Sequence, residues 1–356
     1  MPSRTDRDGL ALETAREDEL TAPGGAIELE VFAAEKDAIE PTRHALHYRR
    51  SGKIGDQRFV YWIQGLAGGV LKEVDAMGLI EVSVSKRVAE VVLNRPEKLN
   101  AMTGPMQDEF LDVLDRLKTD GSAYCVLLRG EGRAFSVGYD LHDIDESREH
   151  NGPVEDWARL MRNTQRWIDV WDFPKPIVSA VHGHCLAGAA FLVSMTDAVI
   201  VADDLVVAWA RVPLGGGWLT PVFTHLVGPR KSFELSTLRG SEMTGLEAAE
   251  YGWANYAVPA DQVLPKARAM AEQIARVPVD LLTINKRAKN RAMERMGFRD
   301  AIVSGIELNN IAHYSRGGQY VRDKLHDLGI KGVIEWFESG GTLEVDFASP
   351  ATSTGG

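Results

Sequence analysis

Two stretches decide the fold of this chain: Arg-Ala-Phe-Ser-Val-Gly-Tyr-Asp-Leu at residues 133–141, and Val-His-Gly-His-Cys-Leu-Ala-Gly at residues 181–188. Each follows an apolar run, so each predicts a small-residue turn at the carboxyl end of a buried strand. Two such turns can direct two backbone N–H groups at one point. A pair of converging N–H donors stabilises negative charge on a carbonyl oxygen, which is a large catalytic effect in many enzymes.

Around these turns the sequence alternates between strand and helix patterns. Predicted strands cover residues 79–85, 88–93, 123–128, 176–181 and 198–202, and predicted helices cover residues 105–119, 155–171 and 188–195. Alternation of this kind indicates an α/β fold of stacked units. After residue 228, apolar residues at helical spacing predict further helices at 229–237, 246–252, 261–276, 279–295 and 298–315.

Composition excludes several classes of protein. The chain has 356 residues, of which 44% are apolar, and it can bury a substantial core. Its net charge of −11 argues against nucleic-acid binding, and no apolar run reaches the roughly eighteen residues of a membrane-spanning helix. The two cysteines, Cys125 and Cys185, offer neither a disulfide framework nor metal-ligand spacing. We therefore expect a cytoplasmic protein without a metal, a nucleic-acid partner or a membrane anchor.

Linked motifs make the chain resemble the enoyl-CoA hydratase/isomerase (crotonase) superfamily over about residues 79–338. They include Leu93-Asn-Arg-Pro-Glu-Lys-Leu-Asn-Ala101, Ala134-Phe-Ser-Val-Gly-Tyr-Asp-Leu141, Gly183-His-Cys-Leu-Ala-Gly188 and Thr196-Asp197. The resemblance implies a spiral of stacked ββα units followed by a helical C-terminal trimerisation region. It also implies a homotrimer, often doubled to a homohexamer.

The resemblance and the composition together divide the chain into four segments. Residues 1–76 are expected to be an N-terminal extension, partly disordered, because residues 1–40 are rich in Glu, Asp, Thr and Ala. Residues 77–255 would form the crotonase-like ββα core with the acyl-CoA site. Residues 256–338 would form the helical region, and residues 339–356 a flexible tail.

The superfamily binds acyl-CoA thioesters and holds the thioester oxygen between two backbone amides, so that an enolate-like intermediate is stabilised. Carried over to this sequence, the two donors would be the N–H groups of Ser136 and Gly188. Arg95, Lys98 and Ala134 would line the pocket for the CoA adenine, pantetheine and phosphates, although basic residues in loops are also commonly just solvated. No cofactor is expected, since coenzyme A is part of the substrate.

The chain departs from the superfamily at the two glutamates with which its hydratases activate water. The corresponding positions hold Phe191 and Arg211. Neither side chain serves as a general base near neutral pH. Phe191 would then border the substrate. Arg211 would either pair with Asp203 or Asp204 or hold a substrate carboxylate through a bidentate contact.

Two residues could replace the missing carboxylates. Asp140 directly follows the first turn, where it would be either an acid/base group or the N-cap of a helix. His184 lies in the second turn, where it would either transfer protons or be a buried histidine bonded to a backbone carbonyl.

These observations predict an acyl-CoA enzyme of the enoyl-CoA hydratase/isomerase type, a lyase or an isomerase, that stabilises a thioester enolate. Isomerisation, decarboxylation and retro-Claisen carbon–carbon cleavage stay open, since they need the pair of amides but not the paired glutamates. A non-catalytic acyl-CoA-binding protein also stays open.

Overall fold

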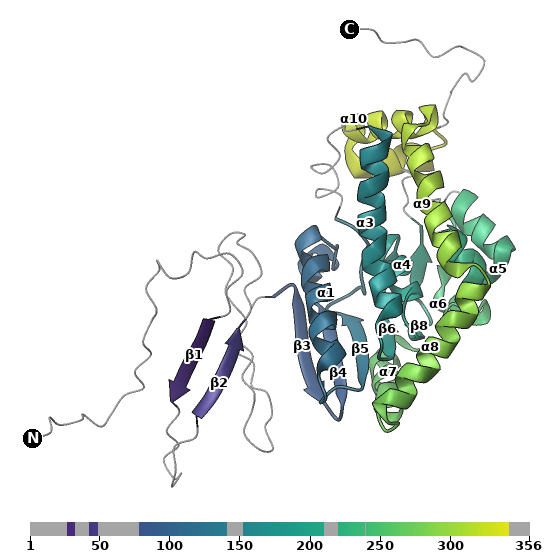
Figure 1. The fold of residues 1–356 in the computed structure, drawn as a ribbon. Helices are drawn as coiled ribbons and strands as arrows, with labels where there is room; N and C mark the ends of the chain where they lie inside the picture. Colours follow the sequence, from purple (N-terminus) through teal and green to yellow (C-terminus); the bar gives the residue numbers. More distant parts are fainter. Residues whose placement is uncertain are drawn as a thin grey trace, which may run out of the picture. The chain divides into compact units, whose positions relative to one another are not determined.

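The structure is a computed structural model of the chain, and it describes residues 27–32, 43–48, 78–140, 152–209, 220–238 and 240–341. It divides into two units, Met1–Gly78 and Leu79–Gly356. In the first unit, strands β1 (Ile27–Phe32) and β2 (Arg43–Tyr48) pair antiparallel (Figure 1). The sequence analysis predicts neither strand, although Ile-Glu-Leu-Glu-Val has the period of two that a strand requires. The rest of the predicted disorder in residues 1–76 lies outside the described residues, as do the residues after 341.

The second unit is built on a six-stranded sheet with the strand order β11-β8-β6-β5-β4-β3. Its strands are β3 (Ile80–Ser85), β4 (Val88–Leu93), β5 (Cys125–Gly130), β6 (Ile177–Val181), β8 (Ala198–Ala202) and β11 (Tyr256–Val258). Only the β3–β4 pair is antiparallel, and the other neighbours in this sheet run parallel. β5 and β6 are buried on both faces, which explains why their sequences are continuous apolar runs.

A second, three-stranded sheet has the order β10-β9-β7. It consists of β7 (His184–Leu186), β9 (Val206–Ala208) and β10 (Glu242–Thr244). None of these strands is predicted from the sequence, because three residues are too few to show a period of two. β7 lies inside the stretch that the sequence analysis interprets as a turn.

Helices cover the sheet and form the C-terminal part of the chain (Figure 1). They are α1 (Gly104–Thr119), α3 (Pro153–Asp172), α4 (Gly188–Ser194), α5 (Thr220–Thr237), α6 (Gly245–Glu250), α7 (Ala260–Ile274), α8 (Val279–Arg295), α9 (Phe298–Tyr314) and α10 (Arg316–Glu338), with a 3-10 turn η2 (Pro96–Lys98). α7 packs against β5, β6 and β8, whereas α3 packs against α1, α4 and α9. These positions confirm the predicted α/β core and helical second half.

One predicted helix is longer than expected. α5 begins at residue 220 rather than 229, and its backbone breaks at Gly228, where φ is 80° and Pro229 follows. The glycine and proline interrupt the helical pattern in the sequence, so only the second part is recognised from it. α10 has a similar break at Gly329, where φ is 66°.

A buried lysine joins α1 to the sheet. Lys175 Nζ donates to the carbonyls of Leu117 at 2.5 Å and Asp120 at 2.7 Å, at the C-terminal end of α1. A cation at this end of a helix satisfies carbonyls that have no partner within the helix. Burial lowers the pKa of Lys175. The ammonium therefore fixes α1 against the start of β6.

The motif Thr196-Asp197 also has a structural role. The Asp197 carboxylate accepts from the Ile177 amide at 2.9 Å, from Lys286 Nζ at 2.7 Å and from Lys289 Nζ at 2.9 Å. Lys286 is buried, and this burial lowers its pKa despite the nearby Asp197 carboxylate. This ion pair joins α8 to the edge of β6, so Asp197 is an anchor of the fold.

Candidate active site

The candidate site lies where β5 and β6 end. These strands are parallel neighbours, so the segments that follow them leave the same edge of the sheet. The two segments run side by side: the Phe135 amide donates to the His182 carbonyl at 2.9 Å, and the Leu186 amide donates to the Ser136 carbonyl at 3.1 Å. Gly183 permits this approach, because a Cβ there would lie 2.1 Å from the Arg133 carbonyl oxygen. The predicted meeting of the two turns is therefore confirmed.

The predicted role of the Ser136 amide is wrong. This N–H donates to the His184 carbonyl at 3.1 Å, so its single hydrogen is already used. The physical reason is that Ser136 pairs with Cys185 as in a parallel sheet, which engages both its N–H and its carbonyl. The Ser136 side chain is engaged too: its Oγ donates to the Asn100 carbonyl at 2.7 Å and accepts from the Gly138 amide at 3.1 Å. Ser136 shapes the turn rather than binding a ligand.

The Gly188 amide is available. Gly188 is buried at the start of α4, and no hydrogen bond of its N–H occurs among the described residues. A buried N–H without a partner is rare in folded proteins, so this group marks a place for a ligand. The preceding Ala187 has φ 47° and ψ −113°, a conformation that costs an L-residue free energy and is typical of functional sites.

Gly138 brings the first turn against this amide. Its φ is +90°, and a Cβ at this position would lie 2.6 Å from the Leu186 carbonyl oxygen and 3.1 Å from the Gly188 nitrogen. Only glycine allows both the backbone conformation and the close approach. The two turns thus converge on Gly188 through Gly138 rather than through Ser136.

Tyr139 forms one wall of the site. Its ring carbons lie 2.9 to 3.0 Å from where a Cβ on Gly188 would stand, so the ring packs directly on this glycine. Trp167 Nε1 donates to the Tyr139 hydroxyl oxygen at 2.6 Å. Burial raises the pKa of Tyr139 to about 12, so the phenol is neutral at physiological pH. The sequence analysis quotes Tyr139 within a motif but assigns no role to its side chain.

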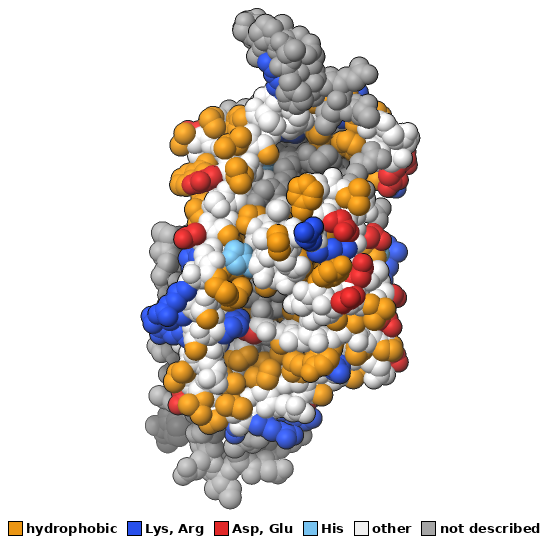
Figure 2. Space-filling view, turned by 90° about the vertical axis from the view of Figure 1, so that its right-hand side faces the viewer, with side chains coloured by type: hydrophobic (Ala, Val, Ile, Leu, Met, Phe, Trp, Pro, Cys, Tyr) orange, Lys and Arg blue, Asp and Glu red, His pale blue; other side chains and the backbone are white. Residues whose placement is uncertain are grey.

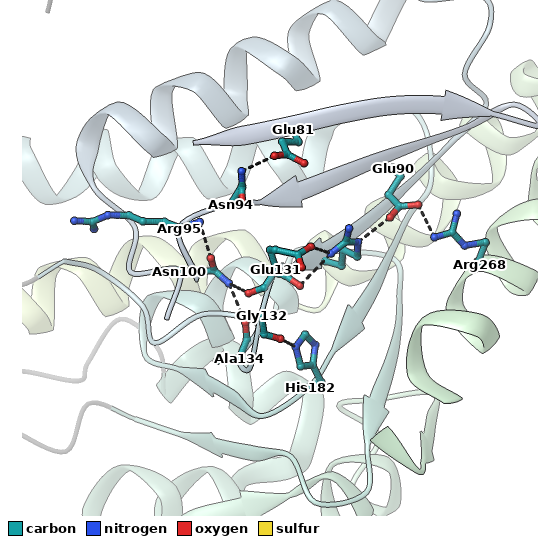
Figure 3. A network of polar contacts seen from close by, with 12 residues as sticks. Glu81, Glu90, Asn94, Arg95, Asn100, Glu131, Gly132, Ala134, His182 and Arg268 are labelled. Carbon is teal, nitrogen blue, oxygen red and sulfur yellow. Dashed lines mark hydrogen bonds and ion pairs between the residues drawn. The ribbon is translucent and has the colours of Figure 1, made fainter. Parts of the chain in front are cut away.

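Asn100 holds the loop after β5 in place (Figure 3). The Asn100 side chain accepts from the Arg95 amide at 2.8 Å and donates to the carbonyls of Glu131 at 2.8 Å and Ala134 at 2.9 Å. Asn100 has no exposed surface, and its φ of 54° is one that asparagine adopts more readily than most residues. Ala134 is itself buried, and its carbonyl is occupied by Asn100, which limits its predicted contact with substrate.

Arg95 and Asp140 are brought together as an ion pair. Arg95 Nη1 lies 2.5 Å from Asp140 Oδ2 and donates to the Ala101 carbonyl at 3.1 Å. From the sequence, Arg95 is expected to bind phosphate and Asp140 to be an acid/base group or a helix N-cap. In the structure each engages the other, so the pair connects the segment after β4 to the first turn.

Further polar contacts fix the same loop (Figure 3). His182 Nε2 lies 2.8 Å from the Gly132 carbonyl oxygen. Glu90 pairs with Arg129 and with Arg268, both at 2.7 Å. Arg129 also pairs with Glu131, and this hydrogen bond lowers the pKa of the Glu131 carboxyl. These contacts make the loop a rigid border of the site.

Comparison with known proteins shows to which family the chain belongs. The sequence model of the enoyl-CoA hydratase/isomerase family matches residues 83–315. The chain belongs to this family. It is therefore an acyl-CoA enzyme of the enoyl-CoA hydratase/isomerase (crotonase) superfamily, a lyase or an isomerase.

Relatives of this enoyl-CoA hydratase/isomerase family member include enzymes of different reactions. The 1,2-epoxyphenylacetyl-CoA isomerase of Escherichia coli is 30% identical over 227 residues, covering 61% of this chain and 83% of the relative. The hydroxycinnamoyl-CoA hydratase-lyase of Pseudomonas fluorescens is 28% identical over 223 residues, covering 61% and 78%. The crystal structure of an enoyl-CoA hydratase/isomerase from Xanthobacter autotrophicus superposes with a TM-score of 0.68 at 29% identity, covering 74% of this chain and 98% of that one.

The remaining predicted site residues of this family member differ in how far they are buried. Phe191 is fully buried in α4 and belongs to the core. Lys98 is exposed at the end of η2. His184 is exposed on β7, on the opposite face from the buried Cys185, so of its two predicted roles the buried histidine bonded to a carbonyl is wrong. Arg211 lies outside the described residues.

Thiol and metal chemistry find no support in the part of the chain that the structure describes. Burial raises the pKa of Cys185 well above its usual value and the pKa of Cys125 to about 12, so neither thiol is an activated nucleophile. Within the described ranges, no group of three or more His, Cys, Asp or Glu residues could hold a metal ion. Nor does any described helix have the length and apolar character needed to cross a bilayer.

Proposed function

We propose that this protein binds the thioester oxygen of an acyl-CoA substrate at the Gly188 amide and stabilises an enolate, without adding water to the acyl group. The buried Gly188 amide, which has no partner among the described residues, carries this proposal, because it is a preformed hydrogen-bond donor next to the turn at Gly138. Donors that are fixed before the substrate arrives need no reorganisation as charge develops.

The residues at the two glutamate positions implied by the resemblance, Phe191 and Arg211, favour reactions other than hydration. By the resemblance, Phe191 would stand where the superfamily's hydratases carry a glutamate, and its side chain is enclosed by the core. Asp140, the carboxylate that follows the first turn, is paired with Arg95. An isomerisation or a carbon–carbon bond cleavage that passes through the enolate fits these residues, and the two named relatives are an isomerase and a hydratase-lyase.

His184 is our candidate for moving the proton. Its ring is exposed and makes no hydrogen bond to the described residues, so it is accessible to solvent. An imidazole ring has one nitrogen that can accept a proton and one that can donate it, as general acid–base catalysis requires. Arg95 and Lys98 stay candidates for the CoA phosphates; Arg95 would first have to exchange its partner Asp140.

The proposal is tested by separating enolate formation from hydration. Acyl-CoA incubated with the protein in deuterium oxide should gain mass at the α-carbon, whereas crotonyl-CoA should not be hydrated at an enzymatic rate. Gly188→Val should abolish the exchange, since a side chain there meets the Tyr139 ring. Gly121→Val is the matched control, because no atom lies within 4 Å of a Cβ at Gly121. Rapid hydration of crotonyl-CoA would refute the proposal.

A second candidate function is acyl-CoA binding without turnover. The Arg95–Asp140 ion pair favours it, because this contact removes a carboxylate from the chemistry at the first turn. Tight binding of several acyl-CoA thioesters, combined with no α-carbon exchange and no product from any of them, would support this function over catalysis.

We also propose that the protein assembles as a homotrimer or a homohexamer. Large apolar side chains are exposed on the helices of the second half, among them Ile284 and Ile311, each at least 60% exposed. Figure 2 looks at the side on which α5 and α9 lie in Figure 1, and hydrophobic side chains are spread over it. Exposed apolar patches are typical of subunit interfaces. Light scattering during gel filtration should give three or six times the chain mass, and a monomer would refute this assembly.

A further inference from the structure

A buried side-chain oxygen on α1 has no hydrogen-bond partner among the described residues. Gln107 is 7% exposed, and its Nε2 donates to the carbonyls of Thr103 at 3.2 Å and Met102 at 3.5 Å. Its Oε1 is buried and accepts no hydrogen bond from the part of the chain that the structure describes. Buried side-chain oxygens are nearly always hydrogen-bonded, so Gln107 marks a place where a donor is missing.

Gln107 lines a small cavity. The cavity measures about 10 Å³, which is room for one group the size of a water molecule or a hydroxyl. The other lining residues are Leu93, Met102, Met106, Phe110, Trp167 and Leu192. Their side chains are apolar except for the Trp167 indole N–H, which is already bonded to Tyr139. Gln107 is therefore the one lining residue whose side chain offers an unused hydrogen-bond acceptor.

The cavity lies next to the candidate active site. Leu192 follows Gly188 by four residues on α4, so the two share a helix face about one turn apart. Trp167 contacts the hydroxyl of Tyr139, whose ring packs on Gly188. Met102 pairs with Tyr139 across an isolated bridge. Three of the lining residues thus contact Tyr139 or lie on the helix that begins at Gly188.

We infer that the far end of the acyl group enters this cavity, and that Gln107 Oε1 accepts a hydrogen bond from a hydroxyl group that the acyl group carries. The inference rests on the proposed binding of the thioester at Gly188. One helical turn spans about 5.4 Å, a length that a short acyl group covers. A methyl group in the same place leaves Oε1 unpaired, and a site built to bind a hydroxyl rejects an analogue that lacks it. Gln107 is thereby a specificity-determining residue.

Binding of saturated thioesters tests the inference without depending on the reaction. We would measure 4-hydroxybutyryl-CoA against pentanoyl-CoA, and 5-hydroxypentanoyl-CoA against hexanoyl-CoA, by titration calorimetry. Within each pair a hydroxyl replaces a methyl group of similar size. At least one hydroxyl compound should bind about tenfold more tightly than its partner, a difference of about 1.4 kcal/mol.

Two variants assign the preference to Gln107. Gln107→Leu should remove the preference by weakening the binding of the hydroxyl compound only. The variant should fold, because leucine replaces an unsatisfied polar group in an apolar wall. Gln165→Leu is the matched control, since Gln165 is exposed on α3, and it should keep the preference. Thermal unfolding of both variants checks that they fold.

Two results overturn the inference while the proposed function stands. In the first, both members of each pair bind the wild type equally, which would assign the cavity to a buried water. In the second, Gln107→Leu keeps the preference. If none of the four thioesters binds, the proposed function fails together with the inference.

Discussion

Replacing Asn100 by alanine should destabilise the second unit by about 3 kcal/mol. The change removes three hydrogen bonds of a side chain with no exposed surface, to the Arg95 amide and to the carbonyls of Glu131 and Ala134. Each such bond contributes on the order of 1 kcal/mol net. The φ of 54° adds to the cost, because alanine tolerates this conformation less well than asparagine. Water reaching the partly buried Arg95 and Glu131 recovers some of this free energy.

Urea unfolding followed by circular dichroism measures this loss. If the free energy of unfolding falls by roughly 3 kcal/mol per molar urea, the urea midpoint of the variant should lie about 1 M below that of the wild type. Asn100→Asp should lose as much, because it keeps the acceptor for the Arg95 amide but sets a carboxylate against two carbonyl oxygens. Acyl-CoA binding should weaken in both variants, since the loop of residues 131–134 borders the site.

Asn163→Ala is the control for removing an asparagine. Asn163 accepts one hydrogen bond, from Arg166, and is only partly buried, so its loss should cost less than 1 kcal/mol. If Asn100→Ala costs no more than this control, then Asn100 does not hold the loop and the account of the network in Figure 3 is wrong.

Three further perturbations test other parts of the structure. Lys286→Met should lower the unfolding free energy by about 3 kcal/mol in urea, because it leaves the partly buried Asp197 carboxylate without its buried partner; an unchanged midpoint would contradict the anchoring role. Because the pKa of Tyr139 is raised to about 12, the unfolded chain loses this proton near pH 10 while the folded protein keeps it. The stability gained by keeping the Tyr139 phenol protonated is therefore complete below pH 10 and falls between about pH 10 and 12. The Tyr139→Phe variant should lose less stability over that range than the wild type. Cys125 and Cys185 should stay unreactive toward a thiol reagent at pH 8 until the protein is unfolded, and fast labelling of the native protein would contradict their burial.

Much of the fold can be predicted from the sequence, because long buried strands and amphipathic helices repeat their pattern over many residues. β5, β6 and α7 to α9 are recognised in this way, and so is the meeting of the two turns after β5 and β6. The direction of the individual amides cannot be predicted. Whether Ser136 offers its N–H to a ligand depends on the three-residue strand β7, and three residues carry no periodic signal.

The roles of single polar residues depend on partners far away in the sequence. Asn100 bonds to residues 31 and 34 positions later, and Arg95 pairs with a carboxylate 45 positions later. Gln107 stands out only because its oxygen, which lies beside a cavity, accepts no hydrogen bond within the described ranges. Such roles become visible once the fold has brought the segments together. Asp140, in contrast, can be singled out from the sequence because it lies next to a recognisable motif.

The backbone at Ala187 sets a limit on engineering this protein. A glycine would adopt the φ of 47° with less strain, so Ala187→Gly is an obvious choice for raising thermal stability. The alanine methyl group, however, narrows the set of conformations open to the chain just before Gly188. A thermostable variant made in this way would allow the following amide to sample more directions, and its gain in melting temperature would come with poorer alignment of the donor that the substrate needs.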